Sequence, residues 1–199
     1  MDRDMNNMSE LEKDIPEKTA GRFTKSAFEW MEDLTFMLVL VAIIFTFILR
    51  LITVDGTSML PNYSDGDRVL VTGDIISVKQ GDVVIINNVL GGPIIKRVIA
   101  TEGQTVDFDA KNKTVLIDGV PLDDSRFGVQ NGITEISWSN YNMLEFPATV
   151  PEGCVFVLGD NRVLSLDSRF ADVGMIDTRN ILGKALIKVF PLNEISLAD

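Results

Sequence analysis

Apolar residues gather in one long run near the N-terminus and in short runs after it. Residues 34–49 read LTFMLVLVAIIFTFIL, without a single charge, and Arg50 separates this run from the apolar LITV that follows. A helix needs about 20 mostly apolar residues to cross a hydrocarbon core of about 30 Å. The run and its flanks therefore predict a transmembrane helix over residues 34–50.

Two other structures fit an apolar run of this length: a buried core helix and a cleaved secretory signal. A signal peptide has a short charged leader, whereas 33 residues precede this run. A small-x-small cleavage site does not follow closely, because LITVDGTSM offers only Gly56 and Ser58. These observations favour an uncleaved membrane anchor.

The distribution of Lys and Arg predicts the orientation of the span. Only Arg50 and Arg68 follow it closely, whereas five basic residues precede it: Arg3, Lys13, Lys18, Arg22 and Lys25. Basic residues are enriched on the cytoplasmic side of a span. We therefore expect a single-pass protein of the plasma membrane, with residues 1–33 as an acidic cytoplasmic tail and residues 51–199 outside the cytoplasm.

Beyond the span, short β-branched runs alternate with Gly, Asp and Pro, which is typical of a β protein. The runs are DRVLVTG, GDVVIINN, IIKRVIAT, QTVDFDA, KTVLIDGVPL and CVFVLGD. In the fifth run an Asp-Gly pair between apolar residues predicts a short hairpin. We expect a mainly β fold over residues 51–199, with one short helical turn at DTRNIL.

Residues 123–149 lack this pattern and are expected to form an irregular excursion. They contain Phe127, Trp138, Tyr141 and Phe146, which could form a satellite core or a membrane-facing surface. Aromatic side chains in sheet domains usually pack inward, which favours the core.

Charge and cysteine content narrow the range of partners. The net charge is -11, and the acidity lies on both sides of the span, whereas nucleic-acid binding needs clustered Lys and Arg. Nucleic acid is therefore not an expected partner. A single cysteine, Cys154, excludes an intrachain disulfide, and without histidine the usual ligands of a zinc site are missing.

The stretch VDGTSMLPNYSDGDRVLV raises the question of a catalytic serine, Ser58. A nucleophilic serine needs a base within hydrogen-bond reach, and a neutral lysine can replace histidine. Such a lysine must lose its proton near neutral pH, against a reference pKa of about 10.4, and desolvation can supply the shift. Lys96 meets this need within the apolar run GGPIIKRVIA, with Ile95 and Arg97 on the opposite face of the strand. A strand with one exposed face, or an edge strand with Lys96 as a gatekeeper, would explain the same lysine without catalysis.

A third stretch, FVLGDNRVLSLDSRFADVG, places seven polar side chains at the end of an apolar strand. They are Asp160, Asn161, Arg162, Ser165, Asp167, Ser168 and Arg169. So many polar groups must satisfy one another or form a site. A turn held by Asp and Asn hydrogen bonds and by Arg–carboxylate pairs explains part of the pattern.

GTSMLP, KRVIATEGQTV and GDNRVLSLDSR, in this order after an N-terminal anchor, resemble the signature boxes of the bacterial type I signal peptidases. The resemblance extends from the span to about Phe190 and leaves out much of residues 123–149. It implies a β-rich extracytoplasmic catalytic domain that removes N-terminal signal peptides from exported preproteins, without metal or cofactor. The implied partners are these signal peptides and the lipid bilayer, and a secretion translocon is a further candidate.

The same resemblance assigns roles to individual residues. Ser58 corresponds to the nucleophile, Lys96 to the general base, and Ser165 to a hydroxyl that orients the lysine. Four residues match those that hold the geometry of the site: Asp160, Arg162, Asp167 and Arg169. Five residues fall where the family lines its substrate pockets for an Ala-x-Ala site: Val54, Met59, Ile94 and Ile95 at S1, and Ile52 near S3.

Three positions depart from the family pattern. Some members have a serine that helps to bind the oxyanion two residues before the nucleophile, where this chain and other branches have glycine, here Gly56. The oxyanion hole would then rest on the Ser58 N–H, with Thr57 or a water. Val163 and Leu164 replace a polar pair, and TEGQ replaces a common PGD.

Two alternative functions belong to other classes. Self-cleaving repressors share the Ser–Lys arrangement, but they are soluble and carry a DNA-binding module, which the predicted span and the acidic N-terminus argue against. A catalytically silent, membrane-anchored β domain would bind exported proteins, but it would not need both Ser58 and Lys96.

Overall fold

The computed structural model describes residues 17–44, 46, 49–73, 77–89, 91–135 and 142–198. Contacts divide the chain into two units, residues 1–45 and 46–199. The first unit contains the helix α1 (Glu17–Ile43), which covers residues 34–43 of the predicted span and begins within the predicted tail. Among the described residues, no helix combines the length and the apolar character needed to cross a bilayer, and the membrane span stays a prediction.

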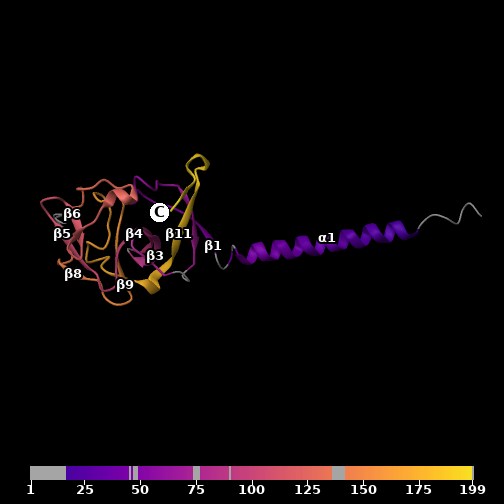
Figure 1. Ribbon diagram of the computed structural model, residues 1–199, viewed down its shortest axis with the longest axis horizontal. Coiled ribbons are helices and arrows are strands. Elements are labelled where there is room, and N and C mark those ends of the chain that lie inside the picture. The colour runs from indigo at the N-terminus through magenta and orange to yellow at the C-terminus, as the bar shows by residue number, and fades with distance from the viewer. Residues whose placement is uncertain are drawn as a thin grey trace, which may run out of the picture. The chain divides into compact units, whose positions relative to one another are not determined.

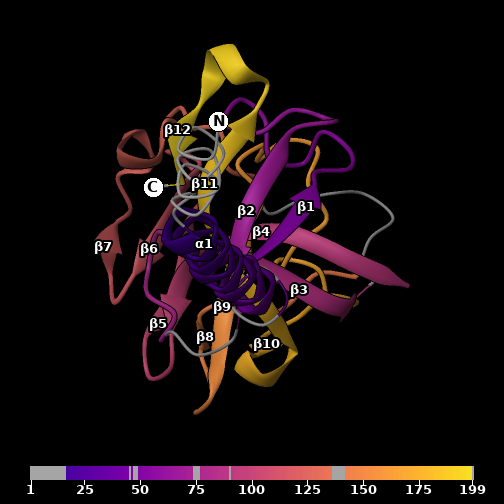
Figure 2. The ribbon, with the colours of Figure 1, turned by 90° about the vertical axis from the view of Figure 1, so that its right-hand side faces the viewer.

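The second unit is mainly β, as predicted, and consists of two antiparallel sheets (Figures 1 and 2). The larger sheet has the strand order β1-β2-β11-β3-β4-β9-β10, and β12 pairs with β11. Its strands are β1 (Leu49–Thr53), β2 (Arg68–Thr72), β3 (Val83–Val89), β4 (Gly92–Thr101), β9 (Cys154–Leu158), β10 (Ile176–Asp177), β11 (Ile181–Phe190) and β12 (Ser196–Leu197).

The smaller sheet has the order β7-β6-β5-β8 and lies to one side of the larger sheet (Figure 2). Its strands are β5 (Thr105–Asp109), β6 (Thr114–Ile117), β7 (Val120–Pro121) and β8 (Ala148–Thr149). Within the described residues, three 3₁₀ helices lie between strands: η2 (Asp124–Phe127), η3 (Thr178–Asn180) and η4 (Leu192–Glu194). The helical turn predicted at DTRNIL corresponds to η3, although its last two residues already belong to β11.

All six apolar runs identified in the sequence form strands. The predicted Asp-Gly hairpin joins β6 to β7. Its two turn residues, Asp118 and Gly119, both have left-handed backbone angles, with φ of 51° and 78°. This is the geometry that a two-residue hairpin turn requires, and it explains why the pair is a strong local signal.

β11, which pairs with β2, β3 and β12 in the larger sheet, was not predicted from the sequence. Its sequence, ILGKALIKVF, contains Gly183 and two lysines, which obscure the alternation of apolar and polar residues. A Cβ at Gly183 would lie 1.9 Å from the Thr72 carbonyl oxygen. The backbones of β11 and β2 therefore approach too closely at this point for any side chain.

β4 is an interior strand that is buried on both faces. Ile99 packs in an apolar cluster with residues of β5, β6 and β9, whereas Val98 packs in another cluster with Val84 and Ile181. Lys96 is 3% exposed and Arg97 is 0% exposed. The two non-catalytic interpretations of Lys96, an open strand face and an edge strand, are therefore wrong.

The described aromatic residues of the 123–149 excursion pack into the core. Phe127 belongs to the apolar cluster that also contains Ile99, and Phe146 packs against that cluster. The Phe146 ring makes edge-to-face contacts with Phe108 and Phe156, at centroid distances of 4.7 and 6.0 Å. Trp138 and Tyr141 lie outside the described residues.

Candidate active site

Ser58 lies on the segment of residues 54–67 between β1 and β2, here called the nucleophile loop. The Lys96 Nζ, from the middle of β4, donates a hydrogen bond of 2.8 Å to the Ser58 Oγ. It donates a second one of 2.9 Å to the Ile95 carbonyl oxygen. Two residues 38 positions apart in the sequence thus form one Ser–Lys pair. Ser58 is half-buried, so its hydroxyl is accessible from one side.

The environment of Lys96 favours its neutral form. Burial lowers the pKa of Lys96 from 10.5 to about 8, because the apolar strand environment replaces the water that would stabilise an ammonium. The negative charges of Asp167 and Asp160 raise the pKa but do not outweigh burial. A lysine in this state can accept a proton near neutral pH, which a surface lysine cannot.

Three buried Arg–Asp pairs involve β4, η2 and the segment of residues 159–169. Arg97 donates to both carboxylate oxygens of Asp160, with two hydrogen bonds of 2.8 Å. The other two pairs are Arg162–Asp124 and Arg169–Asp167, each with an ion-pair distance of 2.8 Å. All six side chains are at most 1% exposed. Each charge is neutralised within its own pair, which makes the burial of six charges tolerable.

These pairs also hold the backbone around the site. Arg162 Nε donates to the Gly159 carbonyl oxygen at 3.0 Å, and the Gly159 N–H donates to Asp167 Oδ2 at 3.1 Å. Asn161 donates from its backbone N–H to the Ser58 carbonyl oxygen, at 3.0 Å. Its side chain donates to the Thr57 carbonyl oxygen, at 3.1 Å. The segment of residues 159–169 thus packs directly on the nucleophile loop.

Ser165 is fully buried in this segment, and its hydroxyl donates to the Leu166 carbonyl oxygen at 3.4 Å. No hydrogen bond joins it to Lys96 in the described part of the chain. Gly159 lies against both serines: a Cβ there would be 2.1 Å from the Ser165 Oγ and 2.5 Å from the Ser58 carbonyl oxygen. Only glycine fits between them.

Gly56 and Thr57 precede the nucleophile on the exposed side of the loop. Gly56 has a left-handed φ of 86°, and its N–H donates to Asp65 Oδ1 at 2.8 Å. This N–H is therefore occupied by the loop itself. Within the described residues, the backbone N–H groups of Thr57 and Ser58 have no hydrogen-bond partner, so they are free to donate to an external group.

A cavity of about 400 Å³ opens beside the Ser–Lys pair. Its wall includes Ser58, Lys96 and four of the residues predicted to contact substrate: Ile52, Val54, Ile94 and Ile95. Met59, the fifth, does not line this cavity. It is 0% exposed and packs in the apolar cluster beneath the nucleophile loop, with Val69 and Val71.

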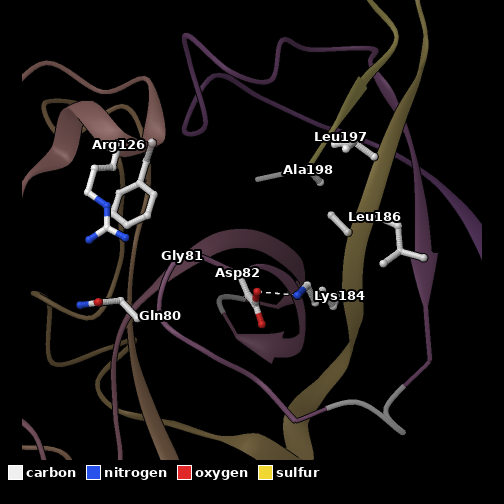
Figure 3. Close-up of a pocket in the computed structure, with 10 residues that line it drawn as sticks. Gln80, Gly81, Asp82, Arg126, Lys184, Leu186, Leu197 and Ala198 are labelled. Carbon is white, nitrogen blue, oxygen red and sulfur yellow. Dashed lines mark ion pairs between the residues drawn. The ribbon is translucent and has the colours of Figure 1, made fainter.

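A second cavity, of about 390 Å³, lies elsewhere in the unit (Figure 3). Arg126 and Gln80 lie on one side of it, Leu186 and Leu197 lie on the other, and Asp82 forms an ion pair with Lys184 between them. Neither member of the Ser–Lys pair lines it. Among the described residues, no group of three or more His, Cys, Asp or Glu side chains is placed to hold a metal ion.

Three residues of this arrangement were not identified as site residues from the sequence: Arg97, Asp124 and Gly159. The strand pattern predicts that Arg97 lies on the face of β4 opposite Lys96. It does not identify the partner of Arg97, because Asp160 lies 63 positions away. Asp124 lies 38 positions from Arg162. The two arginines of the third motif were the available signal for such partners. Buried guanidinium groups require carboxylates, so each arginine indicated that an Asp or Glu must lie near it in the fold.

Comparisons with known proteins identify relatives along most of the chain. The family model for signal peptidase, peptidase S26, matches residues 27–190. Signal peptidase I of Bacillus licheniformis is 34% identical over 189 residues, which are 93% of this chain and 100% of that protein. Signal peptidase I T of Bacillus subtilis (strain 168) is 32% identical over 191 residues, 94% of this chain and 97% of that protein. The crystal structure of a signal peptidase I from Enterococcus faecalis V583 shares 30% sequence identity and covers 55% of this chain and 97% of that chain, with a TM-score of 0.41.

Proposed function

The chain belongs to the signal peptidase family, peptidase S26, and is a serine endopeptidase; on this premise we propose that it cleaves signal peptides from exported preproteins through the Ser58–Lys96 pair and an acyl-enzyme. One observation carries the proposal. The Lys96 Nζ lies 2.8 Å from the Ser58 Oγ, and burial lowers the pKa of this lysine to about 8. At pH 7, about a tenth of the molecules would then hold a neutral lysine at the serine.

The reaction proceeds in two halves. Neutral Lys96 accepts the Ser58 hydroxyl proton while Oγ forms a bond to the scissile carbonyl carbon. The proton passes to the amine of the mature protein as the C–N bond breaks, which leaves the signal peptide as an ester on Ser58. Lys96 then takes a proton from water, and the resulting hydroxide attacks the ester carbonyl carbon. As the bond between this carbon and Oγ breaks, the signal peptide leaves as a carboxylic acid and Lys96 returns its proton to Oγ, which regenerates the serine.

The tetrahedral intermediate of each half needs donors for its oxyanion. The free backbone N–H of Ser58 supports this role, and Thr57, next to it, offers a second N–H and a hydroxyl. Gly56 contributes loop geometry instead, because its N–H is held by Asp65. Preorganised donors of this kind typically contribute 10²- to 10³-fold in rate.

The cavity beside Ser58 supports a preference for small apolar residues before the scissile bond. Its apolar walls come from Ile52, Val54, Ile94 and Ile95, and its volume is about 400 Å³. The small apolar side chains of an Ala-x-Ala sequence would match these walls. Met59 would act from below, by supporting Val54 within the same apolar cluster.

The polar residues around the pair are proposed as positioning groups. Asp160, Arg162, Asp167 and Arg169 hold the segment that contacts the nucleophile loop, as the hydrogen bonds above describe. Ser165 is proposed to act on the Ser58 side of the pair, because its hydroxyl lies against Gly159, next to the Ser58 carbonyl.

We also propose that residues 34–50 anchor the protein in the plasma membrane, with residues 1–33 in the cytoplasm and residues 51–199 outside it. The uncharged run and the excess of Lys and Arg before it support this topology. The lipid bilayer and the secretion translocon would then be partners, and the catalytic unit would meet preproteins as they emerge.

A cleavage assay tests the function. The detergent-solubilised full chain is incubated with a reporter preprotein that carries an Ala-x-Ala site, next to the variants Ser58→Ala, Lys96→Ala and Lys96→Arg. All three variants should be inactive. Ser58→Ala lacks the nucleophile, Lys96→Ala lacks the base, and the arginine of Lys96→Arg stays protonated and cannot act as a base. Ser64→Ala, at an exposed serine of the same loop, is the matched control and should retain full activity. Cleavage by Ser58→Ala would refute the mechanism, and an inactive wild type would favour the silent binding domain.

A further inference from the structure

The nucleophile loop has no regular secondary structure, so contacts must set the distance between Ser58 and Lys96. The two residues lie on different segments, because Lys96 is fixed in the interior strand β4. The loop therefore needs a connection to β4 besides the Ser–Lys hydrogen bond itself.

Asn62, four residues after the nucleophile, makes this connection. Its side-chain amide donates to Asp160 Oδ2 and to the Phe127 carbonyl oxygen, each at 2.7 Å. Its backbone carbonyl accepts a hydrogen bond of 3.3 Å from the Lys188 Nζ. One residue of the loop thus contacts three separate segments of the unit.

Asp160 is the link from Asn62 to β4. The same carboxylate accepts two hydrogen bonds from Arg97, the residue that follows Lys96 in the strand. The Asp160 and Arg97 side chains are both 0% exposed. A buried carboxylate is thus shared between the loop that carries the serine and the strand that carries the lysine.

We propose that Asn62 is a positioning residue for the Ser58–Lys96 pair, because it fastens the nucleophile loop to the Asp160 carboxylate that Arg97 holds on β4. This inference rests on the proposed function. The role requires an amide of this length, since two acceptors must each receive an N–H. The space is also closed on the other side, where a Cβ at Gly128 would lie 2.7 Å from the Asn62 Oδ1.

The proposal predicts a specific kinetic effect. Loss of the amide would release the loop and misplace Ser58, and a misplacement of about 1 Å can cost about 100-fold in rate. Substrate binding should change little, because most of the cavity wall belongs to strands, with Ile52 on β1 and Ile95 on β4. Val54 is at the very start of the loop, and its N–H donates to the Asp67 carbonyl oxygen at 2.8 Å, which holds it without Asn62. We therefore expect kcat to fall about 10- to 100-fold at a nearly constant KM.

The test compares two asparagines that make the same kind of bond. Asn62→Asp replaces the amide by a carboxylate of equal shape that cannot donate to Asp160. Asn112→Asp makes the same change in the turn between β5 and β6, where the Asn112 Nδ2 donates to Asp109 Oδ2 at 2.6 Å. Asn62→Ala removes the amide without adding a charge and is expected to fold, since Asp160 keeps Arg97. The full chain in detergent is assayed for kcat and KM on the reporter preprotein, with far-UV circular dichroism as a folding check.

The expected result is a lower kcat for both Asn62 variants and an unchanged kcat for Asn112→Asp. A wild-type kcat in Asn62→Ala would overturn the proposal, as would a loss that lies entirely in KM. Ser58→Ala is assayed in parallel, because its activity would instead refute the Ser–Lys mechanism. The two failures are therefore distinguishable.

Discussion

Replacing Lys96 by methionine should abolish cleavage and yet make the folded protein more stable at pH 7. Methionine keeps the length and the apolar stem of the side chain but removes the ammonium group. Lys96 is 3% exposed, and its pKa falls from 10.5 to about 8 on burial. At pH 7 most folded molecules therefore hold a protonated, desolvated lysine, which lowers the free energy of unfolding. Methionine carries no charge and does not have this effect.

The size of this cost follows from the pKa shift. A decrease from 10.5 to about 8 corresponds to about 3 kcal/mol at pH values below 8, where the lysine is charged in both the folded and the unfolded states. Lys96→Met also loses the hydrogen bonds to Ser58 and Ile95, which contribute about 1 kcal/mol each. The variant should thus gain about 1 kcal/mol of unfolding free energy at pH 7.

The sign of the difference should reverse at high pH. Between pH 8 and 10.5, the unfolded chain binds a proton that the folded wild type lacks, so wild-type stability rises with pH. Above pH 10.5 the lysine is neutral in both states and the cost is gone. Only the lost hydrogen bonds then remain, and the wild type should exceed Lys96→Met by about 2 kcal/mol.

Urea unfolding of the full chain in detergent, followed by far-UV circular dichroism at pH 7, 9 and 10.5, measures this reversal. Lys79→Met makes the same change at an exposed lysine outside the site and is the control, whose unfolding free energy should stay close to that of wild type. A Lys96→Met variant that is less stable than wild type by the same amount at all three pH values would refute the reasoning, because Lys96 would then not be desolvated.

Three further predictions concern the same site. Wild-type kcat/KM, from initial rates between pH 6 and 10, should rise about tenfold per pH unit and level off above about 8, because neutral Lys96 is the base; a flat profile would contradict this. Gly159→Ala should lose cleavage without losing the far-UV spectrum, because its Cβ would lie 2.1 Å from the Ser165 Oγ; full activity would show that the segment can move. Asp124→Asn leaves the Arg162 guanidinium buried without a counter-charge, which should cost about 3–5 kcal/mol and lower the Tm; an unchanged Tm would mean that the pair is not needed.

Local features of the fold were predictable because a few neighbouring residues determine them. The Asp118–Gly119 turn is an example, since two left-handed backbone angles can be recognised from the residue types alone. β11 was not predictable in this way, because the reason for Gly183 is the Thr72 carbonyl of another strand. A glycine and two lysines in a strand make sense only when the neighbouring strands are known.

The candidate site divides in the same manner. Ser58, Lys96 and the polar residues of the third motif could be named from the sequence, because each belongs to a short motif that resembles one of a known family. Asn62 and Asp124 could not be named, because their importance comes from Asp160 and Arg162, which lie 98 and 38 positions away. Position 62 reads as an ordinary turn residue until its amide is found on a buried carboxylate.

Lys96 and Arg97 are neighbours on β4, but Lys96 contacts Ser58 whereas Arg97 contacts Asp160. The function of the site therefore depends on the register of this strand. Lys96 pairs across the strand with Val84, and Arg97 pairs with Val83. A shift by one residue in one direction would bring Arg97 to Ser58, and a shift in the other direction would bring Ile95 there. The serine would then face either a guanidinium, which never gives up its proton, or an alkyl side chain that cannot accept one. A single-codon insertion or deletion in β4 should therefore be a null allele, even though every amino acid of the site is still encoded. The function of β4 therefore depends on the register of its residues as well as on their identity.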